Sequence, residues 1–290
     1  MPIAHVNGTD LYYESHGSGF PLVFVHGGFG GLGTGPGGQR PEWVPRFAES
    51  FQVILYDRRS SGRSGFPEAR HSMTQFATDR WELLRHLGHD RCHVWGTSAG
   101  GHIALEFGLT FPDAASSLII AESAPWLTRD RHTLASLNER IAVLKEKGPD
   151  AAYAARREGG TVGLNLFAAQ RPAQTPDEAN AREASRAAIQ AQLATVPRAE
   201  RIAKYAGELR TYEAYAEFDA TNRFGELQMP VLVVFGTGDT VFPDASWPEL
   251  TAGKPNVTYL PVEGAEHGAA TNAETLEFML GFLRANTPTK

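Results

Sequence analysis

The stretch HVWGTSAGGHIAL, residues 93–105, places a serine between glycines, at the point where an apolar run gives way to a helix-like pattern. Residues 96–100 fit G-x-S-x-G, which between a strand and a helix exposes a serine hydroxyl above the sheet edge. A serine in so tight a turn has a strained backbone, and side chains at positions 96 and 100 would collide with neighbouring backbone. The stretch therefore predicts a strand, a sharp turn at Ser98 and a helix from Ala99. The other interpretation is a glycine-rich turn with an incidental serine.

Short apolar runs continue this pattern along the chain, at residues 22–25, 53–56, 92–95, 118–121, 231–235 and 257–260. Runs this short and apolar on both faces are typical of buried parallel strands. Segments of helical period lie between several of them, at 73–87 and 99–111, and this alternation indicates an α/β fold with a mostly parallel, doubly wound sheet. Upstream, Asn7-Gly8 between two short runs predicts a hairpin, so the sheet begins with an antiparallel N-terminal edge.

The strand pattern disappears from about residue 127 to residue 224, where alanine, arginine and glutamate dominate. Residues 177–193 and 198–215 have helical patterns, and Gly148-Pro149 ends an earlier helix whose apolar face comprises Leu134, Leu137, Ile141 and Leu144. Strand-like sequence resumes at Val231. We therefore predict a core domain formed by residues 1–126 and 225–290, interrupted by a helical cap at residues 127–224.

Composition narrows the classes of function. The chain has 290 residues and a formal net charge of −6, which disfavours a general nucleic-acid binder. No apolar run is long enough to span a bilayer, and the first residues lack a signal-peptide pattern, so we expect a cytoplasmic protein without membrane contact. The single cysteine, Cys92, is expected to be a buried structural thiol. No cluster has metal-ligand spacing, so we predict no metal; the oligomeric state is left open.

A serine hydroxyl is a poor nucleophile near neutral pH, so chemistry at Ser98 needs a base within hydrogen-bond reach and a third group that orients the base. Asp239 and His267 follow the last two apolar runs, and so stand at strand carboxyl ends on the same sheet edge as Ser98. Glu122 and Asp244 are the other candidate acids, and the motif context favours Asp239.

These residues and two further segments resemble the α/β-hydrolase fold family. FVHGGFGG at 24–31 is similar to the family's HG-x loop, YDRRSSGRS at 56–64 is similar to its D-x-R-G-x-G-x-S segment, and GTSAGG matches its nucleophile turn. The resemblance covers roughly residues 20–125 and 226–286. It implies that Ser98 is the nucleophile, that His267 is the general base and then the general acid, and that Asp239 orients His267.

The resemblance also implies an oxyanion hole made of backbone N–H groups, each of which typically lowers the barrier by about 2.7–4 kcal/mol. Ala99 follows the nucleophile and would supply the first donor; Gly28, with Phe29 as the alternative, would supply the second. Phe29 and Trp126 are candidate walls of the substrate pocket, with burial in the core as the other interpretation. The chain departs from the family at Ser60, which replaces a glycine, so the turn there is expected to differ.

A serine at position 98 favours acyl chemistry over attack by a carboxylate nucleophile, as in haloalkane dehalogenases and epoxide hydrolases. We therefore predict hydrolysis of a small-molecule carboxylic ester or lactone through an acyl-enzyme on Ser98. One alternative is a proline-iminopeptidase-like enzyme, in which Glu213 and Glu217 would hold the substrate amine; another is a carbon–carbon bond hydrolase. A small-molecule receptor and a cofactor-free oxidoreductase are alternatives from other classes.

The glycine-rich segment at residues 33–38 fits G-x-G-x-x-G, and Asp57 lies where a dinucleotide-binding fold has its ribose-binding acid. In that fold, however, the glycines directly follow a strand and open a helix, whereas here HGGFGGL intervenes and two prolines follow. We therefore expect no cofactor and interpret the segment as a mobile wall of the substrate pocket. His26 is expected to hold the loop that carries Gly28.

Overall fold

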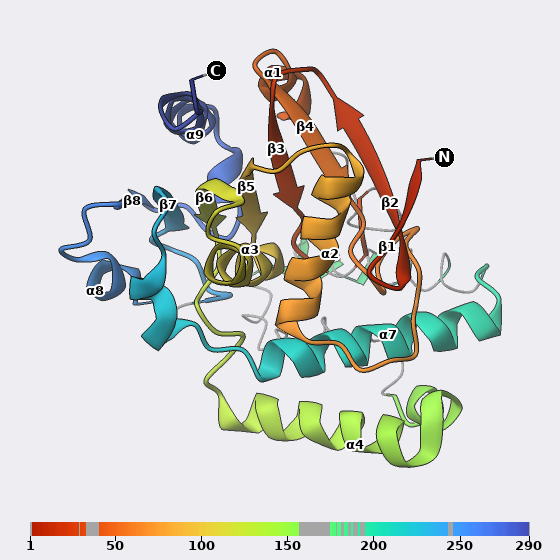
Figure 1. Ribbon diagram of the computed structural model, residues 1–290. Helices are drawn as coiled ribbons and strands as arrows, with labels where there is room; N and C mark the ends of the chain where they lie inside the picture. The colour runs from red at the N-terminus through yellow and green to blue at the C-terminus, as the bar shows by residue number, and fades with distance from the viewer. Residues whose placement is uncertain are drawn as a thin grey trace.

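The computed structural model of the protein describes residues 2–28, 30–32, 41–156, 195–242 and 246–289, with several residues between 175 and 191. In this described part, an eight-stranded sheet has the order β1-β2-β4-β3-β5-β6-β7-β8 (Figure 1). Strands β3 to β8 are parallel to one another, whereas β2 is antiparallel to both β1 and β4. The strands are β1 (Ile3–Val6), β2 (Thr9–His16), β3 (Phe20–Val25), β4 (Phe51–Tyr56), β5 (Cys92–Thr97), β6 (Ala115–Ala121), β7 (Val231–Gly236) and β8 (Val257–Val262). The predicted α/β fold with a mostly parallel sheet is confirmed.

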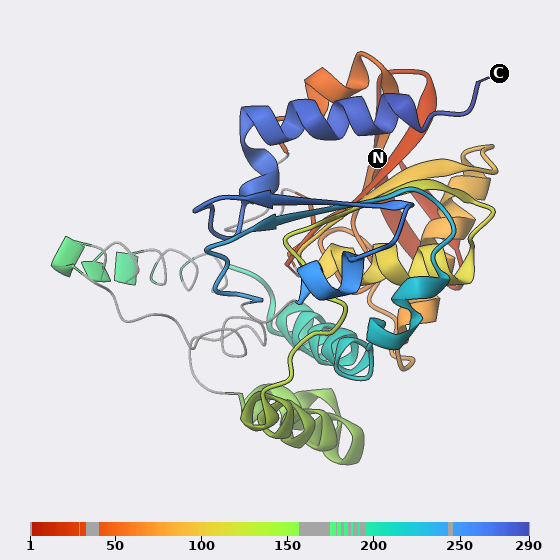
Figure 2. The ribbon, with the colours of Figure 1, turned by 90° about the vertical axis from the view of Figure 1, so that its left-hand side faces the viewer.

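Helices cover both faces of the sheet. Those in the described residues are α1 (Val44–Ala48), α2 (Met73–His86), α3 (Ala99–Thr110), α4 (Arg131–Ala154), α7 (Arg198–Ala216), α8 (Trp247–Thr251) and α9 (Ala273–Ala285), with short 3-10 helices η1 (Thr221–Glu226) and η2 (Ala269–Thr271). Figure 2 shows α1 and α9 on one side of the sheet and α2 and α3 on the other. The sheet is therefore doubly wound.

Strand β5 shows why these runs are apolar at every position. Val94 packs with the residues of α2 and α3, whereas its neighbour Trp95 packs on the opposite face. There the ring of Trp95 lies 4.2 Å from that of Trp43 and 5.6 Å from that of Phe47, between ring centroids. Because successive side chains of a strand point to opposite faces, covering both faces requires an apolar residue at each position.

The antiparallel edge is formed by the hairpin predicted at Asn7-Gly8. Both residues have positive φ, 46° for Asn7 and 72° for Gly8, as the two central positions of a type I′ turn require. Strand β1 is the first in the sheet order, so the N-terminal segment is an edge strand, as predicted.

Helices α4 and α7 come from the predicted insertion and pack against each other, with α7 between α4 and the rest of the chain (Figure 1). The expected helix end at Gly148-Pro149 is a break within α4, because Gly148 has a non-helical backbone with φ 81° and ψ 177°. The pattern at 198–215 corresponds to α7. The predicted helix at 177–193 falls largely outside the described residues.

Candidate active site

Ser98 occupies the turn between β5 and α3 and has an unusual backbone, with φ 50° and ψ −123°. The flanking glycines are sterically required, as the sequence predicts. A Cβ on Gly96 would lie 2.3 Å from the carbonyl oxygen of Gly100, and a Cβ on Gly100 would lie 2.0 Å from that of Val25. The close approach of α3 to β3 and β5 therefore depends on the absence of side chains at both positions.

The structure brings the predicted partners of Ser98 together at the carboxyl ends of three strands. Nε2 of His267, which follows β8, lies 3.0 Å from the Ser98 hydroxyl. Nδ1 of His267 lies 2.8 Å from Oδ2 of Asp239, which follows β7. The Asp239 side chain is fully buried, while that of His267 is 29% exposed. A buried carboxylate at Nδ1 favours the tautomer protonated there, which leaves Nε2 as an acceptor facing the hydroxyl.

The contact between His267 and Asp239 raises the pKa of the histidine and lowers that of the carboxyl group. Burial disfavours protonated His267, but the hydrogen bond and negative charge of Asp239, with a smaller contribution from Glu122, raise the pKa of His267 above its usual value. Burial also disfavours ionised Asp239, yet the pKa of this carboxyl is lowered by His267 and by the backbone N–H groups of Val241 and Phe242. These groups donate to Oδ1 over 2.7 and 3.2 Å. The site therefore holds an ionised acid beside a histidine of increased basicity.

The loop after β3 lies against the serine turn. A Cβ on Gly27 would lie only 2.9 Å from the Cβ of Ser98, and Gly28 has a positive φ of 58°. Nδ1 of the buried His26 lies 2.7 Å from the carbonyl oxygen of Gly27. Burial, together with the charge of Arg58, lowers the pKa of His26 to about 3, so this histidine is neutral and holds the loop that carries Gly28.

Sequence reasoning considered Glu122 as a rival acid at a strand end and missed its contacts with Thr97 and Ala270. Glu122 directly follows β6 with a positive φ of 53°. Its carboxylate accepts hydrogen bonds from the Thr97 hydroxyl over 2.9 Å and from the Ala270 N–H over 2.6 Å. Glu122 therefore joins the end of β5 to η2, the segment after His267. Its place at a strand carboxyl end was the sequence feature that could have indicated this.

Of the two residues predicted to line the substrate pocket, Trp126 lies in the described part of the chain and Phe29 does not. Trp126 is 6% exposed and belongs to the hydrophobic cluster that includes α3 and α7. Its carbonyl oxygen accepts a hydrogen bond from Nε2 of His102 over 2.9 Å, and the guanidinium of Arg129 lies 3.6 Å from the centre of its ring. This agrees with the core interpretation of Trp126. Phe29, Asp244 and the glycine-rich segment at 33–38 lie outside the described residues.

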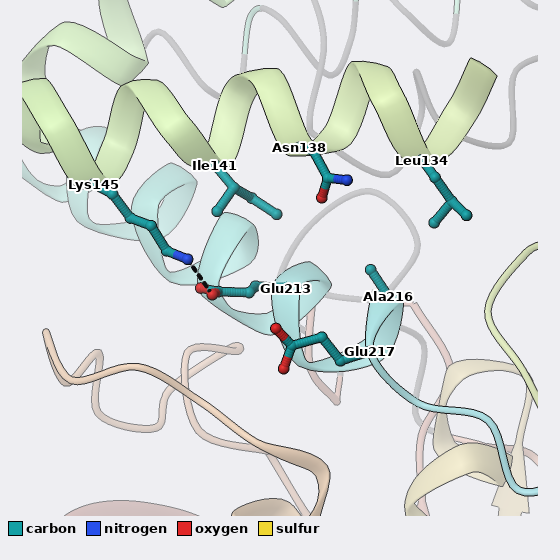
Figure 3. Close-up of a pocket in the computed structure, with 7 residues that line it drawn as sticks. All are labelled: Leu134, Asn138, Ile141, Lys145, Glu213, Ala216 and Glu217. Carbon is teal, nitrogen blue, oxygen red and sulfur yellow. Dashed lines mark ion pairs between the residues drawn. The ribbon is translucent and has the colours of Figure 1, made fainter. Parts of the chain in front are cut away.

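Glu213 of α7 and Glu217, which directly follows α7, line a pocket of about 300 Å³ with α4, but both are paired with cations of the chain. Figure 3 shows the pair between Glu213 and Lys145. Nζ of Lys145 lies 2.5 Å from Glu213, and Nε of Arg70 lies 3.1 Å from it. Arg70 also pairs with Glu217. The residues that line the pocket are Leu134, Asn138, Ile141, Lys145, Glu213, Ala216 and Glu217, and Ser98 is not among them.

Within the described residues, no three or more histidine, cysteine, aspartate or glutamate side chains are grouped so that they could hold a metal ion. Across the same part of the chain, none of the helices combines the length and apolar character needed to cross a membrane. Cys92 is buried, and burial raises the pKa of its thiol to about 11.

Known proteins resemble this chain in sequence and in fold. The model of the family described as "alpha/beta hydrolase fold" matches residues 21–271. A RutD protein from Azorhizobium caulinodans, named for carbamate hydrolysis, is 29% identical over 284 residues, covering 97% of this chain and 98% of its own.

Two solved structures share the fold at lower sequence identity. An enol-lactonase from Burkholderia xenovorans LB400 has a TM-score of 0.66 at 21% identity, covering 98% of this chain and 99% of its own. A thermophilic esterase from Thermogutta terrifontis has a TM-score of 0.69 at 19% identity, covering 98% of this chain and 97% of its own.

Proposed function

The chain belongs to the α/β hydrolase fold family, and on that premise we propose that it is a serine hydrolase that cleaves small carboxylic esters or lactones. The observation that carries this proposal is the hydrogen-bonded chain from Ser98 through His267 to Asp239. A nucleophile, a base and an orienting acid in this order are what acyl transfer at a serine requires. The bond cleaved would be the one between the carbonyl carbon and the alcohol oxygen of the ester or lactone.

The mechanism follows from these contacts. His267 takes the hydroxyl proton at Nε2 as the Ser98 oxygen attacks the carbonyl carbon, and the resulting imidazolium is stabilised by the Asp239 carboxylate. The N–H groups of Ala99 and Gly28 are the proposed donors to the oxyanion. His267 then returns the proton to the leaving alcohol oxygen, and in the second half it activates the water that hydrolyses the acyl-enzyme.

We further propose that residues 127–224 form a cap over this site, which would restrict substrate size and exclude water. Support comes from α7, because the side chain of Tyr215 reaches the first residue of α3. Ala99 is also a proposed oxyanion donor. The cap would thus contact the catalytic machinery directly.

A carbamate is a second candidate substrate. The relative from Azorhizobium caulinodans that is named for carbamate hydrolysis covers nearly the whole chain, including the insertion. Attack by Ser98 on a carbamate carbonyl would use the same residues and give a carbamoyl-enzyme in place of an acyl-enzyme. Esters, lactones and carbamates therefore belong in the same substrate screen.

The proline-iminopeptidase-like alternative is not favoured. In such an enzyme, cap carboxylates must be available to a substrate ammonium group. Both Glu213 and Glu217 are instead paired with cations of the chain, Arg70 and Lys145. An incoming amine would have to displace these cations.

The proposal is tested by treating the protein with a fluorophosphonate probe and measuring its intact mass, with peptide mapping of any adduct. We expect one adduct on Ser98, and neither adduct nor turnover in Ser98→Ala, while that variant still binds substrate. Ser116→Ala is the matched control, because Ser116 is a buried serine of the neighbouring strand β6. Labelling or turnover that survives in Ser98→Ala would exclude the assignment of the nucleophile.

A further inference from the structure

Arg58 is a buried residue, the second after β4, that the proposed mechanism does not use. It is 1% exposed, and its guanidinium contacts two segments far apart in the sequence. One terminal nitrogen donates a hydrogen bond to the carbonyl oxygen of Gly28, and the other donates to the hydroxyl of Tyr215. Its Nε and its backbone N–H also face Nε2 of His26, each at 3.4 Å. Arg58 therefore contacts the loop after β3 at both His26 and Gly28.

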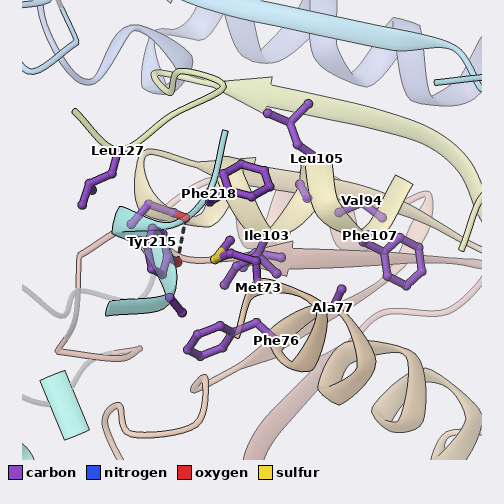
Figure 4. Packing of buried hydrophobic residues seen from close by; sticks show 14 of the residues in the cluster. Met73, Phe76, Ala77, Val94, Ile103, Leu105, Phe107, Leu127, Tyr215 and Phe218 are labelled. Carbon is purple, nitrogen blue, oxygen red and sulfur yellow. Dashed lines mark hydrogen bonds between the residues drawn. The ribbon is translucent and has the colours of Figure 1, made fainter. Parts of the chain in front are cut away.

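Tyr215 continues this connection from the inserted helix α7. Its hydroxyl donates a hydrogen bond to the carbonyl oxygen of Ala99 over 2.9 Å. The side chain is fully buried, with its ring 5.2 Å from that of His102 and 6.0 Å from that of Phe76, between centroids. Figure 4 shows Tyr215 among the buried residues that surround it. Packing thus fixes the direction in which the hydroxyl points.

The donor and the acceptor in each hydrogen bond of this pair are fixed by the chemistry of the two side chains. An arginine side chain only donates, so the Tyr215 oxygen accepts from Arg58 and its single proton goes to Ala99. Burial raises the pKa of Tyr215 to about 12, which keeps that proton on the oxygen near neutral pH. Two carbonyl groups, those of Gly28 and Ala99, are therefore held by one arginine–tyrosine pair.

We propose that Arg58 and Tyr215 are positioning residues that set the separation between the two oxyanion donors, and that through Tyr215 the position of helix α7 controls this separation. The proposal rests on the proposed serine hydrolysis, since it concerns the residues whose N–H groups would bind the oxyanion. Such donors act only when fixed at the place where negative charge develops, and small misplacements are costly. Neither side chain needs to touch the substrate.

Tyr215→Phe tests the proposal because it removes the hydroxyl and keeps the ring. We expect kcat to fall by about tenfold, less than the roughly 10²–10³-fold lost when an oxyanion donor is removed, with KM nearly unchanged. Tyr205→Phe is the matched control, since Tyr205 lies on the same helix, is 7% exposed, and packs its ring on Tyr153. Equal kcat values in the two variants would overturn the proposal.

A double-mutant cycle separates positioning from a general loss of stability. Arg58→Lys keeps the positive charge but lacks the planar guanidinium whose two terminal nitrogens donate to Tyr215 and Gly28. If Arg58 and Tyr215 act as one unit, the variant that carries both Arg58→Lys and Tyr215→Phe should have a kcat no lower than that of the less active single variant. Losses that multiply would show two independent effects and would contradict the proposal.

Hydrogen exchange gives a readout that does not depend on activity. We expect faster amide exchange in the peptides that contain Gly28 and Ala99 in Tyr215→Phe, and wild-type rates in Tyr205→Phe. If the wild-type protein neither reacts with the fluorophosphonate nor turns over any acyl substrate, the proposed hydrolysis fails. The exchange result then still decides whether the pair holds the two segments, and unchanged exchange would reject it.

Discussion

At the scale of single residues, one carboxylate controls both the orientation and the basicity of His267. Asp239 holds Nδ1 at 2.8 Å, and two backbone N–H groups fix its other oxygen. Asp239→Asn keeps the size of the side chain but removes the charge and favours the wrong imidazole tautomer. We expect kcat to fall by about 10⁴-fold, with normal folding shown by circular dichroism. A loss below about tenfold would instead point to Glu122 as the acid.

The pH dependence of the reaction follows from the same pair. The proposed mechanism needs unprotonated Nε2 on His267, and the pKa of His267 is raised above the usual 6.5 in the folded protein. Activity must therefore fall as the pH drops through this raised value, so the acid limb of kcat/KM is expected above pH 6.5. A profile of kcat/KM against pH checks this. The Glu122→Gln variant should shift the limb slightly downward, and an acid limb near pH 5 would contradict the assignment of the base.

At the scale of elements, the site depends on how closely helix α3 approaches strand β3. In Gly100→Ala, the new methyl carbon would lie 2.0 Å from the carbonyl oxygen of Val25, so helix and strand would have to separate. We expect severe loss of stability, seen as a lower melting temperature or insoluble protein. Gly281→Ala is the control, because Gly281 lies in α9 with nothing within 4 Å of an added Cβ. That change should stabilise the protein by about 0.5–1 kcal/mol. Similar melting temperatures for both variants would contradict the packing described.

The elements were predictable from the sequence because each carries its own local pattern. The strand β5, the turn at Ser98, helix α3 and the hairpin at Asn7-Gly8 all follow from contiguous residues whose periods or turn chemistry are distinctive. The place of Asp239 and His267 near Ser98 was predictable for a related reason. Parallel strands align their carboxyl ends, so residues after separate strands meet at one edge.

The contacts between distant side chains were not predictable. Arg58 and Tyr215 are 157 positions apart, and no period or spacing connects them. An arginine next to another arginine after β4, and a tyrosine within an alanine-rich helix, look like surface residues in the sequence. Tyr215 contacts Ala99 and His102 of α3, and Arg58 contacts Tyr215 and Gly28, so their burial depends on segments far apart in the sequence. Ser60 was expected to change the turn in which it replaces a glycine, but it has a positive φ of 56°, a backbone conformation that glycine adopts readily.

At the scale of the whole molecule, a network of ion pairs connects helices α4 and α7 of the predicted insertion to the segment before α2. Glu213 of α7 binds Lys145 of α4 and Arg70, which lies in the segment before α2. The Glu213 side chain is 7% exposed, whereas those of Lys145 and Arg70 are 56% and 59% exposed. Solvent therefore screens the cations, and the network is worth less than a fully buried one. It still joins these three segments at a single carboxylate.

Glu213→Gln removes this charge with little change in shape. We expect the free energy of unfolding to fall by about 1–2 kcal/mol, measured by urea denaturation, because the neutral amide no longer pairs with the charges of Lys145 and Arg70. Glu217→Gln is the matched control, since Glu217 lies four residues further on, directly after α7, is 58% exposed and pairs with the same Arg70. That variant should change stability by less than about 0.5 kcal/mol. High salt should narrow the difference between the two, because screening weakens the exposed partners first. Equal effects of both substitutions would mean that the buried carboxylate of Glu213 stabilises the protein no more than the exposed one of Glu217.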